Sequence, residues 1–514
     1  MEHQSYWRTT ATLPKFGSLN QDLEVDVVVV GAGLTGITAA YLLKREGVKV
    51  ALLERDSCAG GDTGRTTAHL TYVTDNRLHE LVKNWGCDGA RAFWEAGVAA
   101  IDEIFRINSE TGADCGLKWV PGYLHGKLDE QSEQDRKSLQ RDAELAQQLG
   151  FRAEFLEQVP YANRPGVKFE GQAKFHPLKY LAPMIQSIPG DGSYLFENTE
   201  ATEFEADPLV VRAGRYKVRC RYVIIATHTP LMGKTGLVSA TLFQTKLMLY
   251  TSYVLGARLP AGSLPEALFW DTTDPYYYLR VDRYPNHDYL IFGGKDEKTG
   301  QKAGPVFGAL EAELKRFIPD AEVQHRWLGQ VVETNDGLPF IGESADGQFI
   351  ATGFCGNGFT LGTLSAVMAR DRFLGRKNPW FELFDVSRKK FHGGTWRYVT
   401  ENVDFPYYYL RDRIKGAPEG SPDELKTGEG KVMKFQGQKV AAYRGSDGKV
   451  TLLSPVCTHL SCIVRWNAED KTWDCPCHGS RFKPTGEVLG GPAESPLEQV
   501  AWPDQEQKRY DKAA

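Results

Sequence analysis

The sequence has no apolar run that approaches the roughly 20 residues needed for a membrane-spanning helix. Its first residues, MEHQSYWRTTATLPKF, lack the apolar core of a secretory signal. No basic run stands out, and the formal net charge of −5 is spread over the chain, which argues against a nucleic-acid-binding surface. We therefore expect a soluble, cytoplasmic protein without a membrane span, whose partners are small molecules or other proteins.

Because 41% of this long chain is apolar and single cores stop growing near about 250–300 residues, we expect at least two domains.

Cysteine is scarce, with nine residues in a chain of 514. Four cysteines crowd together near the C-terminus, and the others are interpreted as small buried residues or free thiols of a reducing compartment. The scattered cysteines are Cys58, Cys87, Cys115, Cys220 and Cys355.

A strand, a glycine-rich turn and a helix are predicted near the N-terminus. The valine-rich run Val25–Val30 is typical of a strand that is covered on both faces. Gly31, Gly33 and Gly36 follow it with G-x-G-x-x-G spacing. These glycines allow a tight turn, a close approach of backbone to a pyrophosphate, and close packing of helix on strand. The motif therefore indicates a dinucleotide site, with the phosphates at the N-terminus of the following helix.

The pattern continues into a second strand that ends on an acid. Leu34–Glu46 is the predicted helix, and Val48–Leu53 is the second strand. Glu54 follows it, where its carboxylate can accept hydrogen bonds from an adenosine ribose. A glycine-rich turn without a ligand is the alternative, but strand, helix, strand and acid in register argue against it. An acid here disfavours a 2′-phosphate, so FAD or NAD is expected rather than NADP.

Three further segments resemble the D-amino-acid-oxidase-like (glycine/sarcosine oxidase-like) FAD-dependent oxidoreductases. Residues 55–71, RDSCAGGDTGRTTAHLT, resemble the segment that runs along the cofactor toward the flavin ring. Residues 222–230, YVIIATHTP, resemble the strand that returns to the cofactor, and residues 336–369 resemble the closing strand, glycine loop and helix. The resemblance covers residues 25–375 with gaps. It implies an α/β protein with a Rossmann-like FAD-binding domain and an α+β substrate domain.

The resemblance also implies which residues hold FAD. It puts the pyrophosphate at Gly31–Thr35, the adenosine ribose at Glu54 and Arg55, and the flavin ring near residues 65–68 and 353–360. The implied cofactor-binding residues are Gly31, Gly33, Leu34, Thr35, Gly36, Glu54, Arg55, Arg65, Thr66, Thr67, Ala68, Ala226, Thr227, Gly353, Gly358, Phe359 and Thr360.

Residues that anchor substrate carboxylates in this family have no counterpart here. The usual arginine position falls at about Val331, and the usual lysine position holds Thr360, so an amino-acid substrate is not favoured. The cysteine that tethers flavin in some members should fall near Gly329 or Gln330, so FAD is expected to bind without a covalent link. No catalytic residue is assigned, because hydride can leave directly to the flavin ring. Candidates for the substrate-facing side are His69, His228, Arg65, Tyr277, Tyr278 and Cys355.

The candidates Tyr277 and Tyr278 lie in PYYYLR, residues 275–280, which is otherwise typical of an ordinary aromatic strand. The same string recurs at residues 406–411. No longer repeat surrounds it, so the recurrence is interpreted as chance. Cys355 has an equally plain interpretation as a residue small enough for a crowded turn.

Four side chains of metal-ligand type cluster near the C-terminus. Cys457 and His459 lie in CTHLSC, and Cys475 and His478 lie in CPCHGSRF. Two cysteines and two histidines could form a structural zinc site. Zinc fingers, however, usually put both cysteines on one arm and both histidines on the other, whereas here each arm mixes one of each. The mixture suits a Rieske [2Fe-2S] cluster, in which two thiolates hold one iron and two imidazoles the other.

This stretch resembles Rieske domains of the cytochrome bc1/b6f-like branch, which have an all-β fold. The resemblance implies that Cys457, His459, Cys475 and His478 bind the metal, that Cys462 and Cys477 form a disulfide, and that residues 490–497, GGPAESPL, cover the cluster. Ser480 could donate a hydrogen bond to a cluster sulfur. The tyrosine usual two residues later is Phe482 here, so we expect a lower potential than in respiratory Rieske proteins.

These patterns divide the chain into an oxidoreductase region, a connector and a Rieske domain. The oxidoreductase region is expected over residues 20–375, with FAD-binding segments at about 20–75, 166–240 and 326–375 and substrate-side segments at about 76–165 and 241–325; the connector is 376–425, and the Rieske domain is 426–510. The flavin site is expected to be complete without residues beyond 400.

FAD takes two electrons as a hydride, whereas a [2Fe-2S] cluster carries one. The expected function is a soluble FAD-dependent oxidoreductase that oxidises a small organic substrate and relays single electrons through the Rieske cluster to an acceptor, as a dehydrogenase rather than a peroxide-producing oxidase. Two alternatives stay open: a reductase in which electrons enter through the cluster from a donor protein, and a redox sensor or electron carrier without substrate turnover. An NADH-dependent ferredoxin reductase is disfavoured, because only one dinucleotide fingerprint is present.

Overall fold

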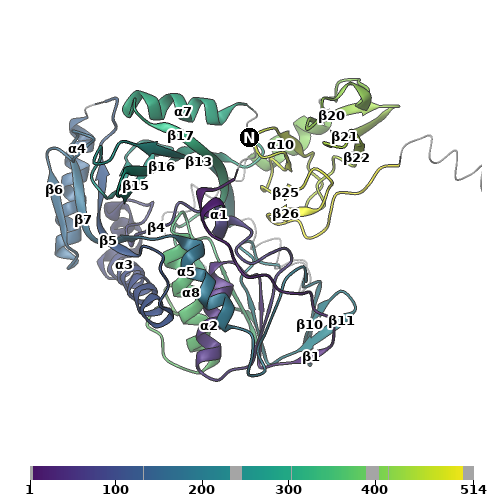
Figure 1. Ribbon diagram of the computed structural model, residues 1–514, viewed down its shortest axis with the longest axis horizontal. Helices are drawn as coiled ribbons and strands as arrows, with labels where there is room; N and C mark the ends of the chain where they lie inside the picture. Colours follow the sequence, from purple (N-terminus) through teal and green to yellow (C-terminus); the bar gives the residue numbers. More distant parts are fainter. Residues whose placement is uncertain are drawn as a thin grey trace, which may run out of the picture.

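The structure is a computed structural model that describes residues 4–130, 132–231, 246–301, 304–388, 404–414 and 416–501. Residues 389–403 of the predicted connector and residues 502–510 of the predicted Rieske segment lie outside the described residues. Figure 1 shows a helix-rich region around α2, α5 and α8, a large sheet that carries α7, and a third region of short strands around β20–β26.

The predicted dinucleotide fold is a six-stranded sheet in the order β18-β19-β12-β2-β3-β8. All of its pairs are parallel except β18 with β19. The four valines of β2 are buried on both faces, as their unbroken apolar run predicts. The strands are β2 (Val27–Val30), β3 (Val50–Leu53), β8 (Tyr194–Phe196), β12 (Tyr222–Ile225), β18 (Phe340–Ala345) and β19 (Gln348–Thr352).

Helices cover one face of this sheet and a small second sheet covers the other. Figure 1 shows α2 (Leu34–Arg45), α5 (Pro177–Ser187) and α8 (Gly358–Phe373) side by side, and α2 packs against both of the others. On the other face, Val28 and Val30 share an apolar cluster with Val211 and Val218 of the small sheet. The small sheet contains β1 (Leu23–Glu24), β9 (Glu203–Ala206), β10 (Leu209–Ala213) and β11 (Tyr216–Arg219).

A nine-stranded mixed sheet forms the second layer, in the order β17-β13-β16-β15-β14-β5-β7-β4 with β6 paired to β7. Three of its strands, β4, β7 and most of β17, fall in segments that the sequence analysis assigned to FAD binding. β4 pairs with β7, β7 with β5 and β17 with β13, so all three belong to the substrate-side sheet. The strands are β4 (His69–Leu70), β5 (Lys118–His125), β6 (Ala153–Leu156), β7 (Gly166–Lys174), β13 (Leu247–Leu259), β14 (Leu268–Asp271), β15 (Tyr278–Tyr284), β16 (His287–Lys298) and β17 (Glu322–Thr334).

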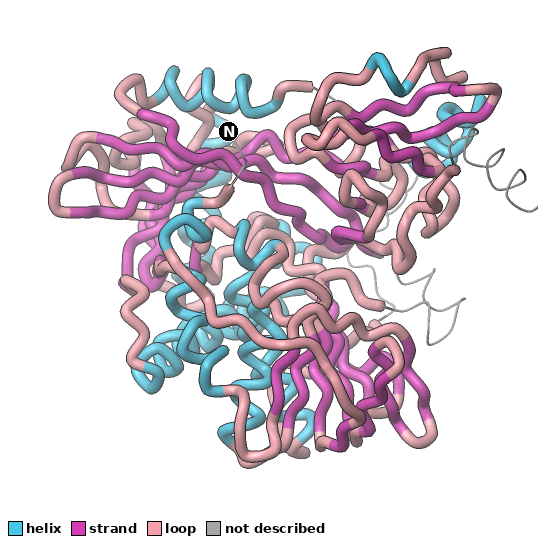
Figure 2. Tube along the Cα trace, turned by 45° about the vertical axis from the view of Figure 1, so that its right-hand side comes forward, coloured by secondary structure: helices cyan, strands magenta, loops and turns pink. Residues whose placement is uncertain are grey.

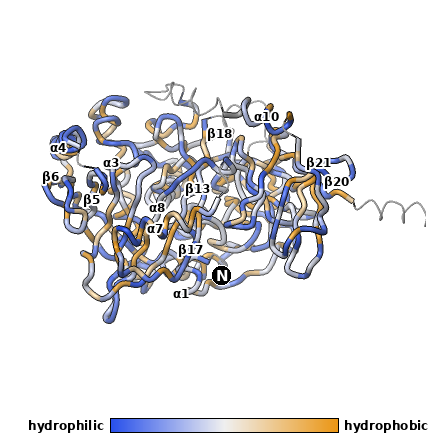
Figure 3. The backbone as a smooth tube through the Cα atoms, turned by 90° about the horizontal axis from the view of Figure 1, so that it is seen from above, coloured by the Kyte–Doolittle hydropathy of each residue, from blue (hydrophilic) through white to orange (hydrophobic). Residues whose placement is uncertain are grey.

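Three helices flank this sheet, and a short one lies near the N-terminus. The helix α4 is mostly polar, and Figure 3 shows it largely in hydrophilic colours. The helix α3 has a kink at Gly86, where the backbone leaves helical geometry. The helices are α1 (Tyr6–Thr10), α3 (Leu78–Thr111), α4 (Glu133–Gln148) and α7 (Val306–Phe317), with a 3-10 turn η1 (Asp62–Arg65). Among the described residues, no helix combines the length and apolarity that crossing a membrane requires.

The C-terminal region consists of two small antiparallel sheets, as expected for an all-β domain. Its fold begins inside the predicted connector, because Glu419 bridges to Lys434 of β20 and the helix α10 packs Tyr409 against the domain core. Figures 1 and 2 show these strands beside one end of the nine-stranded sheet. The elements are α10 (Asp404–Ile414), η2 (Pro422–Glu424), β20 (Gly430–Phe435), β21 (Gln438–Arg444), β22 (Val450–Leu453), β23 (Arg465–Asn467), β24 (Thr472–Asp474), β25 (Arg481–Phe482) and β26 (Val488–Gly490).

Candidate flavin cavity and iron-sulfur centre

A cavity of about 970 Å³ lies where the six-stranded and nine-stranded sheets meet the C-terminal region. It collects most of the residues that the resemblance assigned to FAD, from five separate stretches of the chain. The predicted residues that line it are Gly31, Gly33, Leu34, Thr35, Glu54, Arg55, Arg65, Thr66, Thr67, Ala226, Thr227, Gly353, Gly358 and Phe359.

Three predicted cofactor-binding residues do not line this cavity but shape its walls. A Cβ at Gly36 would overlap the carbonyl oxygen of Gly31, so this glycine permits the close packing of helix on strand. Ala68 is buried, and its carbonyl accepts a hydrogen bond from Arg280 at 2.8 Å. Thr360 donates its hydroxyl to the carbonyl of Thr71 at 2.9 Å, so that hydroxyl is already used within the protein.

The dinucleotide end of the cavity fits FAD. Gly31 has a φ of +97°, and a Cβ there would lie 2.7 Å from the carbonyl oxygen of Ala226, so only glycine fits between the ends of β2 and β12. The carboxylate of Glu54 accepts hydrogen bonds from the backbone N–H groups of Ala32 and Asp56, at 2.7 and 2.8 Å. The N-terminus of α2 borders the cavity, which is where a pyrophosphate binds in such folds.

Cys355 and His228 line the cavity, and the Cys355 thiol does not have the properties of a reactive group. Burial raises the pKa of the Cys355 thiol to about 12, so it stays protonated and is a poor nucleophile. His228 adopts a φ of +66°, and its Nδ1 lies 4.0 Å from a carboxylate oxygen of Asp62. Both residues belong to the cavity wall.

Aromatic and acidic side chains form the substrate-side part of the cavity. Ser252 of β13 donates to Asp296 of β16 at 2.6 Å, and its oxygen lies 2.7 Å from the hydroxyl of Tyr278. The ring of His69 stands edge-on to Tyr278, with centroids 5.7 Å apart. Burial lowers the pKa of His69 to about 3, so its imidazole is neutral. Tyr276 donates its hydroxyl to Asp75 at 3.0 Å.

The prediction for Tyr277 was wrong. Its ring stacks on Phe292 with centroids 5.6 Å apart, and it lies outside the cavity lining. Successive side chains point to opposite faces of an extended segment, so Tyr276 and Tyr278 face the cavity while Tyr277 faces the core. Sequence reasoning missed Tyr276, Ser252 and Asp296, although period-two alternation through PYYYLR could have indicated Tyr276.

Arg65 borders the cavity, but its guanidinium is directed to the C-terminal region. It forms an ion pair with Asp470 at 2.8 Å, and Asp470 also pairs with Arg481 at 2.6 Å. Burial tends to raise the pKa of Asp470, but Arg481 and Arg65 lower it below its ordinary value. Arg65 therefore links the cavity wall to the C-terminal region.

The four predicted metal ligands come together in two loops of the C-terminal domain. The thiols of Cys457 and Cys475 are buried and lie beside each other. The rings of His459 and His478 lie edge to face, with centroids 4.9 Å apart. Burial lowers the pKa of His459 to about 4 and that of His478 to about 3, which keeps both imidazoles neutral as ligation requires. Thiol beside thiol and imidazole beside imidazole fit a cluster with one sulfur-bound and one nitrogen-bound iron.

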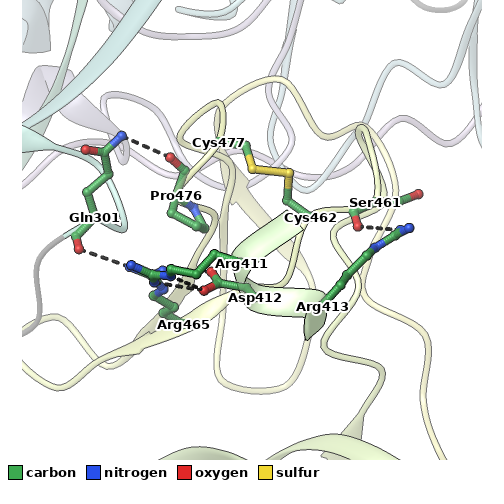
Figure 4. The surroundings of a disulfide bond; sticks show 9 residues. All are labelled: Gln301, Arg411, Asp412, Arg413, Ser461, Cys462, Arg465, Pro476 and Cys477. Atoms are coloured by element: carbon green, nitrogen blue, oxygen red, sulfur yellow. Dashed lines mark hydrogen bonds and ion pairs between the residues drawn. A yellow bond between two sulfur atoms is a disulfide. The ribbon is translucent and has the colours of Figure 1, made fainter. Parts of the chain in front are cut away.

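A disulfide joins the two loops. The sulfurs of Cys462 and Cys477 are 2.03 Å apart, and Figure 4 shows the bond between the loops. The sulfurs of Cys462, Cys475 and Cys477 all lie within 4.8 Å of one another, but only Cys475 among them is a free thiol. The hydroxyl of Ser480 accepts the N–H of Ala493 at 3.1 Å and lies close to the Cys457 thiol.

The C-terminal domain supplies part of the flavin cavity wall, which the sequence analysis did not foresee. Leu489, Gly490, Gly491 and Ala493 line the same cavity as the glycine-rich turn. Residues beyond 400 thus border this cavity, although the sequence analysis expected the flavin site to be complete without them. No local sequence signal indicates this, because the contact depends on how two separately recognisable domains are packed together.

Comparison with known proteins supports both the flavin-binding region and the iron-sulfur domain. Residues 26–372 match the family described as FAD dependent oxidoreductase, and residues 417–501 match the Rieske [2Fe-2S] domain. Over 508 residues the chain is 32% identical to YhfW of Bacillus subtilis (strain 168), which is named as a Rieske 2Fe-2S iron-sulfur protein, with 97% of each chain covered.

Two further relatives cover the oxidoreductase region. Gamma-glutamylputrescine oxidoreductase of Escherichia coli (strain K12) is 25% identical over 445 residues, which are 80% of this chain and 99% of that protein. The crystal structure of glycine oxidase from Geobacillus kaustophilus has a TM-score of 0.57 at 19% identity, covering 72% of this chain and 100% of that one. The second likeness concerns the fold alone.

The chain belongs to the FAD-dependent oxidoreductase family and carries a Rieske [2Fe-2S] domain after the oxidoreductase region. The predicted fold class is confirmed. The cofactors of the protein are FAD and a [2Fe-2S] cluster. When bound, FAD accepts two electrons together and the cluster carries one at a time.

We predict the composition of the purified protein from these donors. It should contain FAD that acid releases, because neither Gly329 nor Gln330 can form a covalent link, and about two irons and two sulfides per chain. Acid extraction, iron analysis and sulfide analysis check this. Stoichiometric zinc without acid-labile sulfide would contradict the ligand assignment, and flavin that stays with the precipitated protein would contradict non-covalent binding.

Proposed function

We propose that this protein oxidises a small cationic amine at FAD and delivers the electrons singly, through its Rieske cluster, to an external acceptor. The observation that carries the proposal is the shared wall: residues of the Rieske domain line the flavin cavity itself. Gln330 donates its side-chain amide to the carbonyl of Gly479 at 2.8 Å, next to the predicted ligand His478. Such contact favours a direct electron route between the two centres.

The choice of an amine is supported by the acidic character of the substrate-side residues. Burial and the negative charge of Glu333 together raise the pKa of Asp296 to about 7, against the lowering effect of the hydrogen bond from Ser252. A bound cation would relieve both effects, because it replaces lost hydration and offsets the neighbouring charge. Tyr250, Trp270 and Tyr278 also line the cavity, and aromatic faces attract alkylammonium groups.

Two other features agree with this substrate class. The positions at which relatives bind a substrate carboxylate hold Val331 and Thr360, which carry no positive charge. A relative at 25% identity is named for gamma-glutamylputrescine, a compound that contains an amine. Removal of two electrons and two protons from an amine gives an imine, which water hydrolyses to a carbonyl compound and free amine or ammonia.

Anaerobic bleaching of the flavin absorbance band tests the proposal in the purified full-length protein. Primary and secondary alkylamines should bleach it, whereas N-methyl amino acids and hydroxy acids should not. Adding a one-electron acceptor should then restore the band, and added oxygen alone should restore it more slowly. Bleaching by hydroxy acids but not by amines would exclude the substrate class. If no metabolite bleaches the flavin but reduced ferredoxin does, the reverse direction replaces this proposal.

A further inference from the structure

The Rieske segment from Leu489 to Ala493 borders the flavin cavity at two places. At one place, Arg55 donates to the carbonyl of Leu489 at 3.0 Å, beside the residues predicted to hold the adenosine ribose. At the other, a Cβ on Gly490 would lie 3.5 Å from the side-chain oxygen of Gln330. The segment therefore runs between two regions that both belong to the oxidoreductase domain.

Polar contacts hold this arrangement from both domains. Gln330 donates to Gly479 and also to Thr299 of the loop after β16, at 2.8 and 3.1 Å. Arg465 donates to the carbonyl of Gln301 at 3.0 Å, and the amide of Gln301 donates to Pro476 at 3.3 Å, as Figure 4 shows. Lys483 pairs with Asp56 at 3.1 Å.

The centre of the junction is buried and charged. The side chains of Arg481 and Asp470 are 3% and 8% exposed, and Arg65 of the oxidoreductase domain completes the set through its 2.8 Å contact with Asp470. Separating the domains would break the contact between Arg65 and Asp470 and leave Arg481 as the remaining cation of this set, which disfavours the open state. Tight packing adds to this, because a Cβ at Gly479 would lie 2.6 Å from Leu249 of β13.

We propose that Leu489–Ala493 is a part of the FAD-binding site and that the Rieske domain is a fixed wall of it, so that FAD binding and domain docking stabilise each other. A ligand that contacts both domains binds the docked state more tightly than the undocked one, and the coupling is reciprocal. The inference goes beyond the proposed function, since it depends neither on the substrate nor on the direction of electron flow.

Hydrogen–deuterium exchange of the full-length protein tests the proposal. FAD added to the protein after removal of its flavin should slow amide exchange in residues 27–36, which contain the glycine-rich turn. It should also slow exchange in residues 486–497 of the Rieske domain by about tenfold, since closing the cavity suppresses local opening. Residues 430–444, which contain β20 and β21 and are absent from the cavity lining, should exchange at an unchanged rate.

A matched pair of variants tests the contribution of this Rieske segment to the cavity wall, and the FAD dissociation constant is the quantity measured. Gly490→Phe should raise the FAD dissociation constant about tenfold (about 1.4 kcal/mol), because the backbone accepts a side chain there but the added ring occupies the cavity. Glu498→Phe adds the same ring to an exposed position of the same domain and should leave the dissociation constant unchanged. Iron and sulfide content should be normal in both.

Slowed exchange in residues 27–36 without any change in residues 486–497 would overturn the proposal, and so would normal FAD affinity in a Gly490→Phe protein that retains its iron. If Gly490→Phe lost the cluster, the exchange measurement on the unaltered chain would decide alone. None of these readouts requires turnover, so an error in the proposed substrate would leave them unaffected.

Discussion

Replacing His478 with alanine should strongly slow delivery of electrons to a one-electron acceptor while the substrate still bleaches the flavin. The predicted ligand set has two imidazoles on one iron, and losing one of them leaves that iron under-coordinated. Iron content should fall well below two per chain. Steady-state reduction of the acceptor should fall by about 100-fold, the upper end of the range seen when the surroundings of a metal centre are altered. Iron analysis and anaerobic stopped-flow spectroscopy measure the two effects.

His287→Ala is the matched control for this variant, because that histidine lies outside both the cavity lining and the cluster loops. Its iron content and turnover should be normal. A His478→Ala protein that keeps two irons and two sulfides would show that the ligand assignment is wrong. Loss of the cluster with unchanged turnover would remove the Rieske domain from the electron route. Loss of flavin bleaching by the substrate, with FAD still bound, would favour entry of electrons through the cluster.

Local signals were sufficient to predict the dinucleotide fold and the cluster loops. Gly31 and Gly36 are required at their positions because backbone atoms occupy the space that a Cβ would need. Local requirements of this kind can be recognised in a short sequence motif. The cluster loops are equally local, since Cys457 and His459 lie two residues apart and Cys475 and His478 lie three apart. The fold around both sites therefore follows from short segments.

The two copies of PYYYLR show where local information fails. At residues 275–280 the string leads into the strand β15, whereas at residues 406–411 it lies within the helix α10. In the first copy Tyr278 and Leu279 pair with β16 in an antiparallel ladder. Aromatic residues have only weak intrinsic preferences, so the surrounding packing decides between strand and helix. Tyr276 and Tyr277 could likewise be told apart only by the face that each one presents.

The junction between the domains could not be predicted, because nothing in its sequence distinguishes it from ordinary surface. Arg65, Asp470 and Gln330 are common polar residues, and their roles appear only when residues more than a hundred positions apart come together. Gln330 is instructive, since the sequence analysis considered it only as a residue unable to tether flavin. Its structural role is the contact with Gly479.

Asp296→Asn should weaken binding of the amine and flatten its pH dependence. Burial raises the pKa of Asp296 to about 7, so the carboxyl is neutral below that pH and charged above it. A neutral acid does not attract a cation, and kcat/KM for an amine should therefore rise as the pH increases from about 6 to about 8. Asparagine should raise KM by roughly 10- to 100-fold, as for loss of a hydrogen bond to a charged group. Steady-state kinetics over this range measures both effects.

Ser252→Ala separates this ionisation from a merely structural effect. The Ser252 hydroxyl lowers the pKa of Asp296, whereas burial and the negative charge of Glu333 raise it. Removing the hydroxyl should move the rise in kcat/KM to higher pH without abolishing it, because the Asp296 carboxyl itself is still present. FAD content should be normal in both variants. An Asp296→Asn protein that kept the rise near pH 7 would assign the ionisation to another group, and an unchanged KM would mean that the amine binds elsewhere in the cavity.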